Sequence, residues 1–297
     1  MASADGPSLT DSPDPYFQDE HGLYVSDTGV RHDEGSYSSK GFLILQEMQQ
    51  RHFWYKGRQR VLHAAIDRHV PPADRRGRRV LDLGCGVGGW LAYVRQHQLF
   101  ANSELAGADS SRDALLASRE LTGKAVPHYV VDLTSLGWKA RWDTVFLLDV
   151  LEHVKEDHSA LASVFESMTP GGFAFLTVPA LRAFWSWNDK AVGHHRRYSR
   201  GELEALAKRS GFEVRETRYF MFLLSPLVLL TRLASRRRAR RADEEQLWQL
   251  IQQQHAPPIE PLNSALAATL RLESALGNHL QYPWGSSLLA VLRKPAE

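Results

Sequence analysis

The stretch VLDLGCGVGG, residues 80–89, constrains the fold more than any other part of the chain. A short apolar run of strand length ends in a glycine-rich turn, and an amphipathic segment over 87–98 predicts a helix after it. Gly84, Gly86 and Gly89 have the spacing G-x-G-x-x-G, which is typical of a turn that lets the backbone approach a nucleotide-like ligand. The stretch therefore predicts the first strand–turn–helix unit of an α/β domain.

Strands and helices are expected to alternate beyond this unit. Apolar runs at 104–111, 127–133, 142–150 and 173–179 predict strands, and 112–123 and 157–172 predict helices between them. This order favours a parallel, doubly wound sheet with right-handed crossovers. A helix at 200–211, a strand at 212–220 and a last strand at 286–294 complete a Rossmann-like, seven-stranded α/β fold with a helical insertion before the last strand.

The predicted organisation has five segments. They are a disordered, acidic and proline-bearing tail (1–20), an N-terminal helical cap (21–77), a cofactor-binding core (78–220), a helical insertion or lid (221–285) and the last strand of the core sheet (286–297). The cap is expected to hold two helices broken near Gly57. The insertion is too long for a turn, and its leucines are expected to be buried over the acceptor pocket, as suggested by the helical spacing of Leu262, Leu266 and Leu270.

Composition excludes several classes of protein. The net charge of +2 gives no global argument for nucleic acid, and Cys85, the single cysteine, excludes an intrachain disulfide and a cysteine-rich zinc site. The N-terminus does not resemble a secretory signal. No apolar run reaches the roughly 20 residues that span a bilayer. A cytoplasmic location is expected, with peripheral contact at the inner face of the membrane as an alternative.

Four predicted strands end in an acid: Asp82, Asp109, Asp132 and Asp149. Ligands of open parallel sheets bind at these carboxyl ends. Crowded carboxylates would repel the pyrophosphate of a dinucleotide, which argues against a dehydrogenase. They suit S-adenosylmethionine, because that molecule carries an ammonium, a sulfonium and a ribose. Asp82 would favour the cationic end, Asp109 the ribose hydroxyls and Asp132 the adenine amino group.

These stretches resemble the motifs of class I S-adenosylmethionine-dependent methyltransferases. VLDLGCGVGG resembles the first motif, ELAGADSS the second, LDVLEHV the fourth-strand motif and PGGFAFLTVP the fifth-strand region, in the family's order. HFWYKGR (52–58) and WNDKAVGHHRRYSRGEL (187–203) further resemble a bacterial branch near the ubiquinone-pathway O-methyltransferases. The resemblance implies a transferase that binds S-adenosylmethionine and releases S-adenosylhomocysteine. The predicted cofactor-binding residues are Tyr55, Arg58, Asp82, Gly84, Cys85, Gly86, Asp109, Ser110, Asp132, Leu133 and Asp149.

The acceptor side is expected to use the fourth-strand motif and the GHHRRYS stretch. His194, His195 and His153 are candidate general bases. Residues expected to line the acceptor pocket are Trp185, Trp187, Arg196, Arg197 and Tyr198. Alternatively, Arg197 and Tyr198 brace the next helix, which Ser199 would cap. The related E-x-x-E-H group is associated with a divalent metal, but Asp149 replaces its first glutamate, and no metal is expected.

The predicted reaction is in-line methyl transfer to an oxygen or nitrogen of a small-molecule, sugar or lipid-linked acceptor. The alternative is a non-catalytic cofactor-binding or regulatory protein.

For the stretch 219–241, an apolar run followed by RRRARR, three roles stay open: a buried helix that packs on the lid or on a second subunit, contact with a membrane, and contact with nucleic acid. The last is the least favoured, because stacking aromatic residues do not accompany the basic cluster.

Overall fold

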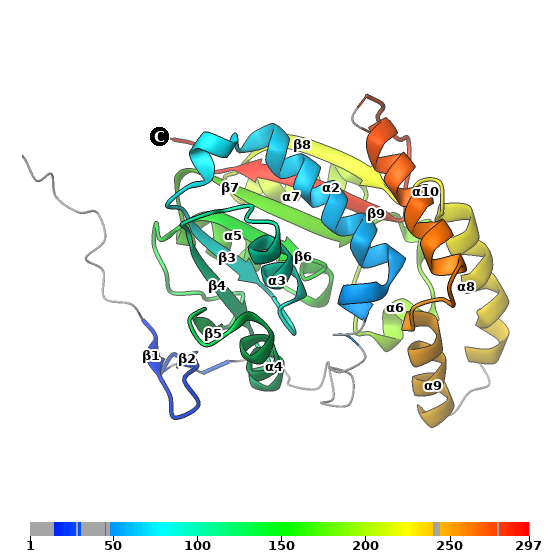
Figure 1. Cartoon of the computed structure of the whole chain (residues 1–297), viewed down its shortest axis with the longest axis horizontal. Helices are drawn as coiled ribbons and strands as arrows, with labels where there is room; N and C mark the ends of the chain where they lie inside the picture. Colours follow the sequence, from blue (N-terminus) through cyan, green and yellow to red (C-terminus); the bar gives the residue numbers. More distant parts are fainter. Residues whose placement is uncertain are drawn as a thin grey trace, which may run out of the picture.

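The computed structural model describes residues 15–27, 29, 30, 45, 48–239, 244–277 and 279–296. Its centre is a single sheet in the order β1-β2-β5-β4-β3-β6-β7-β9-β8 (Figure 1). Five central strands are parallel to one another and follow the predicted positions: β3 (Arg79–Leu83), β4 (Glu104–Asp109), β5 (His128–Val130), β6 (Trp142–Leu148) and β7 (Met168–Pro179). The chain reverses its direction across the sheet between β5 and β6, so β3 and β6 meet at the topological switch point.

Helices cover both faces of this sheet, as expected of a doubly wound fold. Along β6, Val145 and Leu147 pack with α5 (Asp157–Ser167) and α7 (Arg200–Arg209), whereas Phe146 and Leu148 pack with α2 (Phe53–His69) and α3 (Gly89–Gln96). Successive side chains of a strand point to opposite faces. The near-continuous apolar run of β6 therefore contributes side chains to the hydrophobic cores on both faces of the sheet. The helix α4 (Arg112–Thr122) packs beside α3.

One edge of the sheet is antiparallel. The last strand in sequence, β9 (Ser287–Arg293), lies between β7 and β8 (Glu213–Phe220) and runs opposite to both. Because of this reversal, Ser287 at its start pairs with Pro179 and with Phe220, at the carboxyl ends of its two neighbours. The insertion thus leaves and re-enters the sheet at the end where ligands bind in such folds.

The other edge carries two strands that the sequence did not predict. Strand β1 (Phe17–Gln18) pairs with β2 (Tyr24–Val25), and β2 pairs with β5. Tyr16 is buried, and its hydroxyl donates to the Leu136 carbonyl at 2.8 Å. The predicted disordered tail is therefore wrong over residues 15–20, and the segment after it extends the sheet before any helix begins. The remainder of the predicted tail, 1–14, lies outside the described residues.

The predicted break near Gly57 is also wrong. Helix α2 runs through this glycine, and the interruption lies at His52, whose side chain accepts from the Trp54 amide and caps the helix. A Cβ at Gly57 would lie 2.5 Å from Leu270 Cδ1. Gly57 therefore permits α10 of the insertion to pack closely on α2.

The insertion is helical, with α8 (Ser225–Ala239), α9 (Glu244–His255) and α10 (Leu262–Gly277). Leu270 is buried as expected, but against α2. Leu262 and all four leucines of α8 are exposed, which corrects the prediction that the leucines of the insertion are buried. Among the described helices, none is both long enough and apolar enough to cross a bilayer. The side chains of RRRARR lie outside the described residues.

Candidate active site

The glycine-rich turn after β3 is held by the neighbouring strand. The amides of Gly84 and Cys85 both donate to the Ala108 carbonyl, at 2.7 and 3.0 Å. Gly84 has a φ of +76°, and a Cβ there would lie 2.4 Å from Val150 Cγ2. Glycine is required at this position because both the backbone conformation and the space exclude a side chain.

The carboxylate of Asp109 completes the turn. One oxygen accepts from the Gly86 amide and the other from the Ser111 amide, both at 2.9 Å. Burial raises the pKa of Asp109, and hydrogen bonds from the backbone of Ser111, Gly86 and Ser110 oppose that rise. Asp109 therefore organises the loops after β3 and β4. Its predicted contact with a ribose stays a prediction.

Asp82 is the most unusual acid of the site. It is buried, and its Oδ2 atom has no hydrogen-bond partner among the described residues. Burial raises the pKa of Asp82 to about 7, although the Arg58 guanidinium lowers it and Asp109 raises it further. A buried oxygen without a partner is costly. This atom is suited to receive a donor from a ligand.

The other predicted residues near these strand ends make contacts within the protein. One oxygen of Asp132 accepts from the Thr134 amide and hydroxyl at 2.9 and 2.6 Å, and Leu133 is buried in the core. Cys85 is buried, and burial raises the pKa of its thiol well above the usual value. Its thiol is therefore inert as a nucleophile. The ends of β3, β4 and β5, with Asp82, Asp109 and Asp132, are called the cofactor half below.

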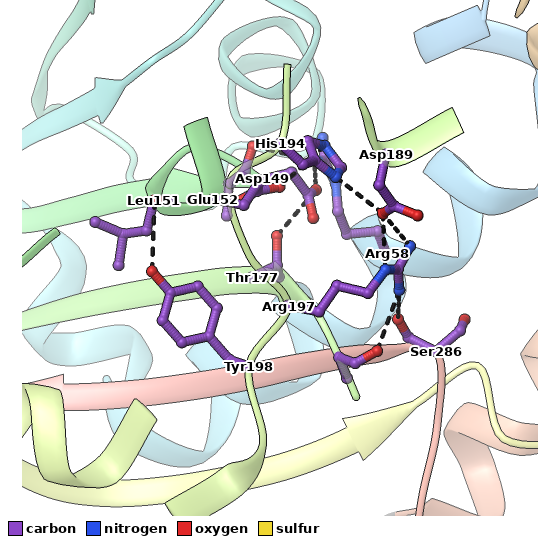
Figure 2. Close-up of polar contacts among 12 residues, drawn as sticks. Arg58, Asp149, Leu151, Glu152, Thr177, Asp189, His194, Arg197, Tyr198 and Ser286 are labelled. Atoms are coloured by element: carbon purple, nitrogen blue, oxygen red, sulfur yellow. Dashed lines mark hydrogen bonds and ion pairs between the residues drawn. The ribbon is translucent and has the colours of Figure 1, made fainter. Parts of the chain in front are cut away.

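The end of β6 begins the second half of the site (Figure 2). Asp149 has a φ of +60°, an uncommon conformation for a residue other than glycine. Its Oδ2 atom accepts from the Thr177 hydroxyl at 3.1 Å and forms an ion pair with Arg58. The Arg58 guanidinium also lies over the rings of Trp54 and Tyr55, about 5 Å from each centroid. This residue thus connects α2 to the strand end.

Asp189 is the centre of a buried polar network in α6 (Trp187–Ala191). Its carboxylate accepts from Arg197 at 2.7 Å and from the Nδ1 atom of His194 at 3.1 Å (Figure 2). Arg232 of α8 lies 3.4 Å from the same carboxylate. Burial acts to raise the pKa of Asp189, but the bond from His194 and the charges of Arg197 and Arg232 outweigh it and lower the pKa. Asp189 is therefore ionised and fixed from three directions.

This arrangement sets the orientation of His194. A carboxylate only accepts hydrogen bonds, so Nδ1 carries the proton and Nε2 is left as the basic atom. Nε2 lies 3.9 Å from Glu152 Oε1, and the His153 ring is 4.7 Å away in an edge-to-face arrangement. Burial raises the pKa of Glu152 well above its usual value, and neither of its oxygens has a hydrogen-bond partner among the described residues. The Glu152 carboxyl and the Nε2 atom of His194 therefore face each other inside the protein.

The other predicted bases are less suitable. Burial, together with His194 and His195, lowers the pKa of His153 to about 3, which makes it a weak base at neutral pH. The His195 side chain is exposed, and only its amide takes part, by donating to the Glu152 carbonyl at 2.8 Å. Single ligand atoms of Glu152, His153 and His194 lie within 4.8 Å of one another. This spacing is compatible with a metal ion, although none was expected.

Three of the predicted pocket residues contact other parts of the protein, and their predicted contact with an acceptor stays a prediction. Arg196 pairs with Asp157, and the Tyr198 hydroxyl donates to the same carboxylate at 2.9 Å. Arg197 is buried, and it donates to the Ala180 carbonyl in addition to Asp189. Ser199 caps α7 in a capping box, as predicted. The GHHRRYS stretch therefore mainly braces its surroundings, and His194 is the member directed at the site.

Trp185 and Trp187 are half-buried on either side of Ser186, the N-cap of α6. Their predicted contact with an acceptor stays a prediction. Two residues of the network, Asp189 and Arg232, were not predicted. A local signal exists for Asp189, because Ser186 and Asp189 form a capping box of the S-x-x-D type. Arg232 had no such signal. The ends of β6 and β7 with this network are called the acceptor half below.

A family model described as a methyltransferase domain matches residues 53–217. The chain belongs to this family. The match begins at the first residue of α2 and ends within β8, so it includes both halves of the site except Arg232. The insertion and β9 lie beyond it.

Curated relatives are similar over part of their length. A ubiquinone biosynthesis O-methyltransferase from Thiobacillus denitrificans is 31% identical over 117 residues, which are 38% of this chain and 47% of the relative. An (S)-coclaurine N-methyltransferase from Papaver somniferum is 28% identical over 118 residues, 38% of this chain and 33% of that one. The chain spans about half the length of the ubiquinone-pathway relatives it matches.

Solved structures share the fold. The phosphoethanolamine N-methyltransferase 2 of Haemonchus contortus, in complex with S-adenosyl-L-methionine, has a TM-score of 0.55 at 17% identity over 88% of this chain and 58% of its own. The cyclase SpnF has a TM-score of 0.50 at 19% identity over 80% of this chain and 81% of its own. At these identities the likeness concerns the fold alone.

Proposed function

We infer that the chain is an S-adenosylmethionine-dependent methyltransferase acting on an oxygen or nitrogen of a small-molecule, sugar or lipid-linked acceptor by in-line displacement. The observation that carries the proposal is the unpartnered Asp82 carboxyl oxygen beside the glycine-rich turn. Fold analogy alone would be weaker support, since one fold hosts many activities. The family and the O- and N-methyltransferase relatives support the same reaction class.

The cofactor half fits S-adenosylmethionine. Asp82 offers its free oxygen to the ammonium, and the glycine turn leaves room for the ligand. Asp109 and Asp132, at the next two strand ends, would meet the ribose and the adenine amino group. When bound, the cofactor supplies a methyl group activated by a sulfonium. Arg58 has a buried Nε atom without a hydrogen-bond partner among the described residues. It could therefore interact with the cofactor's carboxylate while keeping its pair with Asp149.

The acceptor half supplies orientation and a base. Asp189 fixes the His194 tautomer, so that Nε2 can take the proton of an acceptor hydroxyl or neutral amine as the new bond to the methyl carbon forms and the bond from that carbon to the sulfonium sulfur would break. Burial raises the pKa of Glu152, and its two unpartnered oxygens can orient the acceptor. Most of the rate gain is expected from positioning, with proton removal as a secondary contribution. The protein would act in the cytoplasm, on small or lipid-linked acceptors and not on nucleic acid, with a homodimer as one possible state.

Two neighbouring histidines provide a matched test. His194→Ala should lower turnover about 100-fold, the scale of a lost general base, while His195→Ala should leave it unchanged because that side chain is exposed. Both variants should bind S-adenosylmethionine as the wild type does in calorimetry. Turnover would be followed by mass spectrometry of a cell extract incubated with enzyme and methyl-labelled cofactor.

Equal rates in the wild type and both variants would show that the base lies elsewhere. A protein that binds the cofactor but yields no S-adenosylhomocysteine with any extract would instead support the alternative of a non-catalytic binding protein. Nicotinamide cofactor binding in the same calorimeter would point to a dehydrogenase and overturn the proposal.

A further inference from the structure

Exposed apolar side chains gather on the insertion. Of the twelve large hydrophobic residues that are exposed in the described part of the chain, eleven lie between 223 and 284, and the other is Phe17. Single exposed leucines are ordinary on protein surfaces. A concentration of this kind in one segment marks a surface that meets something else.

Helix α8 carries the clearest part of this surface. Its outward side, called the α8 apolar face below, consists of Leu223 in the preceding turn and Leu227, Leu229, Leu230 and Leu233. Pro226 and Ala234 on the same side are also exposed. Between 219 and 235 the one charged residue is Arg232, and it is turned inward to the Phe184 carbonyl and Asp189. The helix therefore presents an uncharged apolar side to its surroundings.

A dense basic stretch follows this face directly in the sequence. Five of the six residues 236–241 are arginine, and the stretch 236–245 stays net positive with the three acids 243–245 counted. Leucines with adjacent arginines are the composition of segments that lie in the plane of a bilayer surface, where leucines enter the headgroup boundary and arginines meet lipid phosphates. The helix is too short to span the bilayer.

We propose that the α8 apolar face, with the arginines that follow it, docks on the surface of an anionic lipid bilayer. The occupant is inferred from charge complementarity, because a phosphate-bearing surface offers the opposite charge that a second copy of the same arginine-flanked face does not. Figure 1 shows α8 at the end of the molecule opposite β1 and β2.

The docking surface is connected to the acceptor half. Arg232 projects from the inner side of α8 to Asp189, the residue that orients His194. Glu273 of α10 accepts from the amides of Phe222 and Leu223 at 3.0 and 2.9 Å and fixes the turn that leads into α8. A bilayer held on the outer side of α8 would bring a lipid-linked acceptor to the mouth of the site. This last step rests on the proposed function, whereas the docking does not.

Vesicle co-sedimentation of the full chain tests the docking. The wild type should bind vesicles of phosphatidylcholine with phosphatidylglycerol, bind pure phosphatidylcholine at least tenfold more weakly, and lose binding as salt is raised. Leu227→Ser with Leu230→Ser should lower binding to the anionic vesicles at least tenfold. Phe17→Ser, an equally exposed apolar residue at the far end, is the matched control and should bind as the wild type does.

A second variant separates charge from apolar contact. Arg236→Gln, Arg237→Gln and Arg238→Gln together should weaken anionic binding by roughly fivefold per arginine and leave any binding to neutral vesicles unchanged. Calorimetry with S-adenosylmethionine should be the same for every variant, so failure of the cofactor proposal would be seen separately. Equal vesicle binding by the wild type and the double leucine variant would overturn the docking. A wild-type dimer that the leucine variant converts to a monomer, without vesicle binding in either, would assign the face to a second copy.

Discussion

The cofactor half and the acceptor half both place acids at strand ends, but they hold them differently. In the cofactor half, Asp109 accepts from amides of its own loop and of the adjacent glycine turn, and Asp132 from Thr134 two residues on. In the acceptor half, Asp149 is paired with Arg58, 91 positions away in sequence, and Asp189 is paired with the nearby Arg197 and with Arg232, 43 positions away. The first half is therefore built from local geometry, and the second is assembled from distant helices.

This difference predicts whether loss of an acid in each half lowers ligand affinity, stability or both. Removing an acid that holds its own loop should mainly affect ligand affinity, because the strands around it stay packed. Removing an acid that neutralises buried arginines should affect folding as well, because a buried charge left without a partner is strongly destabilising.

The largest effect is expected in the acceptor half. Asp189→Ala should lower the free energy of unfolding by about 3–5 kcal/mol, because Arg197 would be left buried and without its carboxylate. Chemical denaturation followed by circular dichroism measures this. Ser186→Ala is the milder control, because it removes only a hydrogen bond from an uncharged hydroxyl to the same carboxylate. An Asp189→Ala loss below about 1 kcal/mol would mean that the network is not a structural element.

A smaller effect on binding is expected in the cofactor half. Asp109→Ala should weaken S-adenosylmethionine binding about tenfold or more, since hydrogen bonds to charged groups contribute roughly 1.5–3 kcal/mol. Part of that loss would come from the turn, because the Gly86 and Ser111 amides lose their acceptor. Isothermal titration calorimetry on the folded variant is the measurement. Unchanged affinity would remove Asp109 from the cofactor site.

The pKa of Asp82 predicts a pH dependence of cofactor binding. With a pKa of about 7, the carboxyl is protonated at pH 6 and ionised at pH 8. Only the ionised form attracts an ammonium, so affinity should rise about tenfold from pH 6 to pH 8. Asp82→Asn should bind more weakly at pH 8 and show a flat profile. A wild-type profile that is already flat would exclude Asp82 as the partner of the cationic group.

The smallest effect is expected from Arg232→Gln, which tests whether the insertion affects the acceptor half alone. Arg232→Gln removes the most distant cation of the Asp189 network but leaves Arg197 and His194 in place. Stability should fall by about 1 kcal/mol, the scale of a typical hydrogen bond, and turnover should fall by less than for His194→Ala. Cofactor affinity should stay constant. A loss of affinity would show that the insertion acts on the cofactor half as well.

Helix and strand positions in the core could be predicted because they depend on local patterns. Glycines at 84 and 86, strand-end acids and the alternation of apolar runs placed seven strands and the cofactor half near their observed positions. The same reasoning failed where a partner far along the chain decides the outcome. The sequence predicts a helix break near Gly57, because nothing near this glycine in sequence reveals that Leu270 packs against it.

The sequence by itself determined the parallel α/β core and the acids at its strand ends, since strand period and turn chemistry act over a few residues. Only the tertiary structure decided which polar groups meet. It directs His194 toward Glu152 and leaves His195 exposed, and it brings Arg232 from the insertion to Asp189. It also turned the leucines of α8 outward, because their burial depends on what packs against the helix and not on the periodicity of the helix itself.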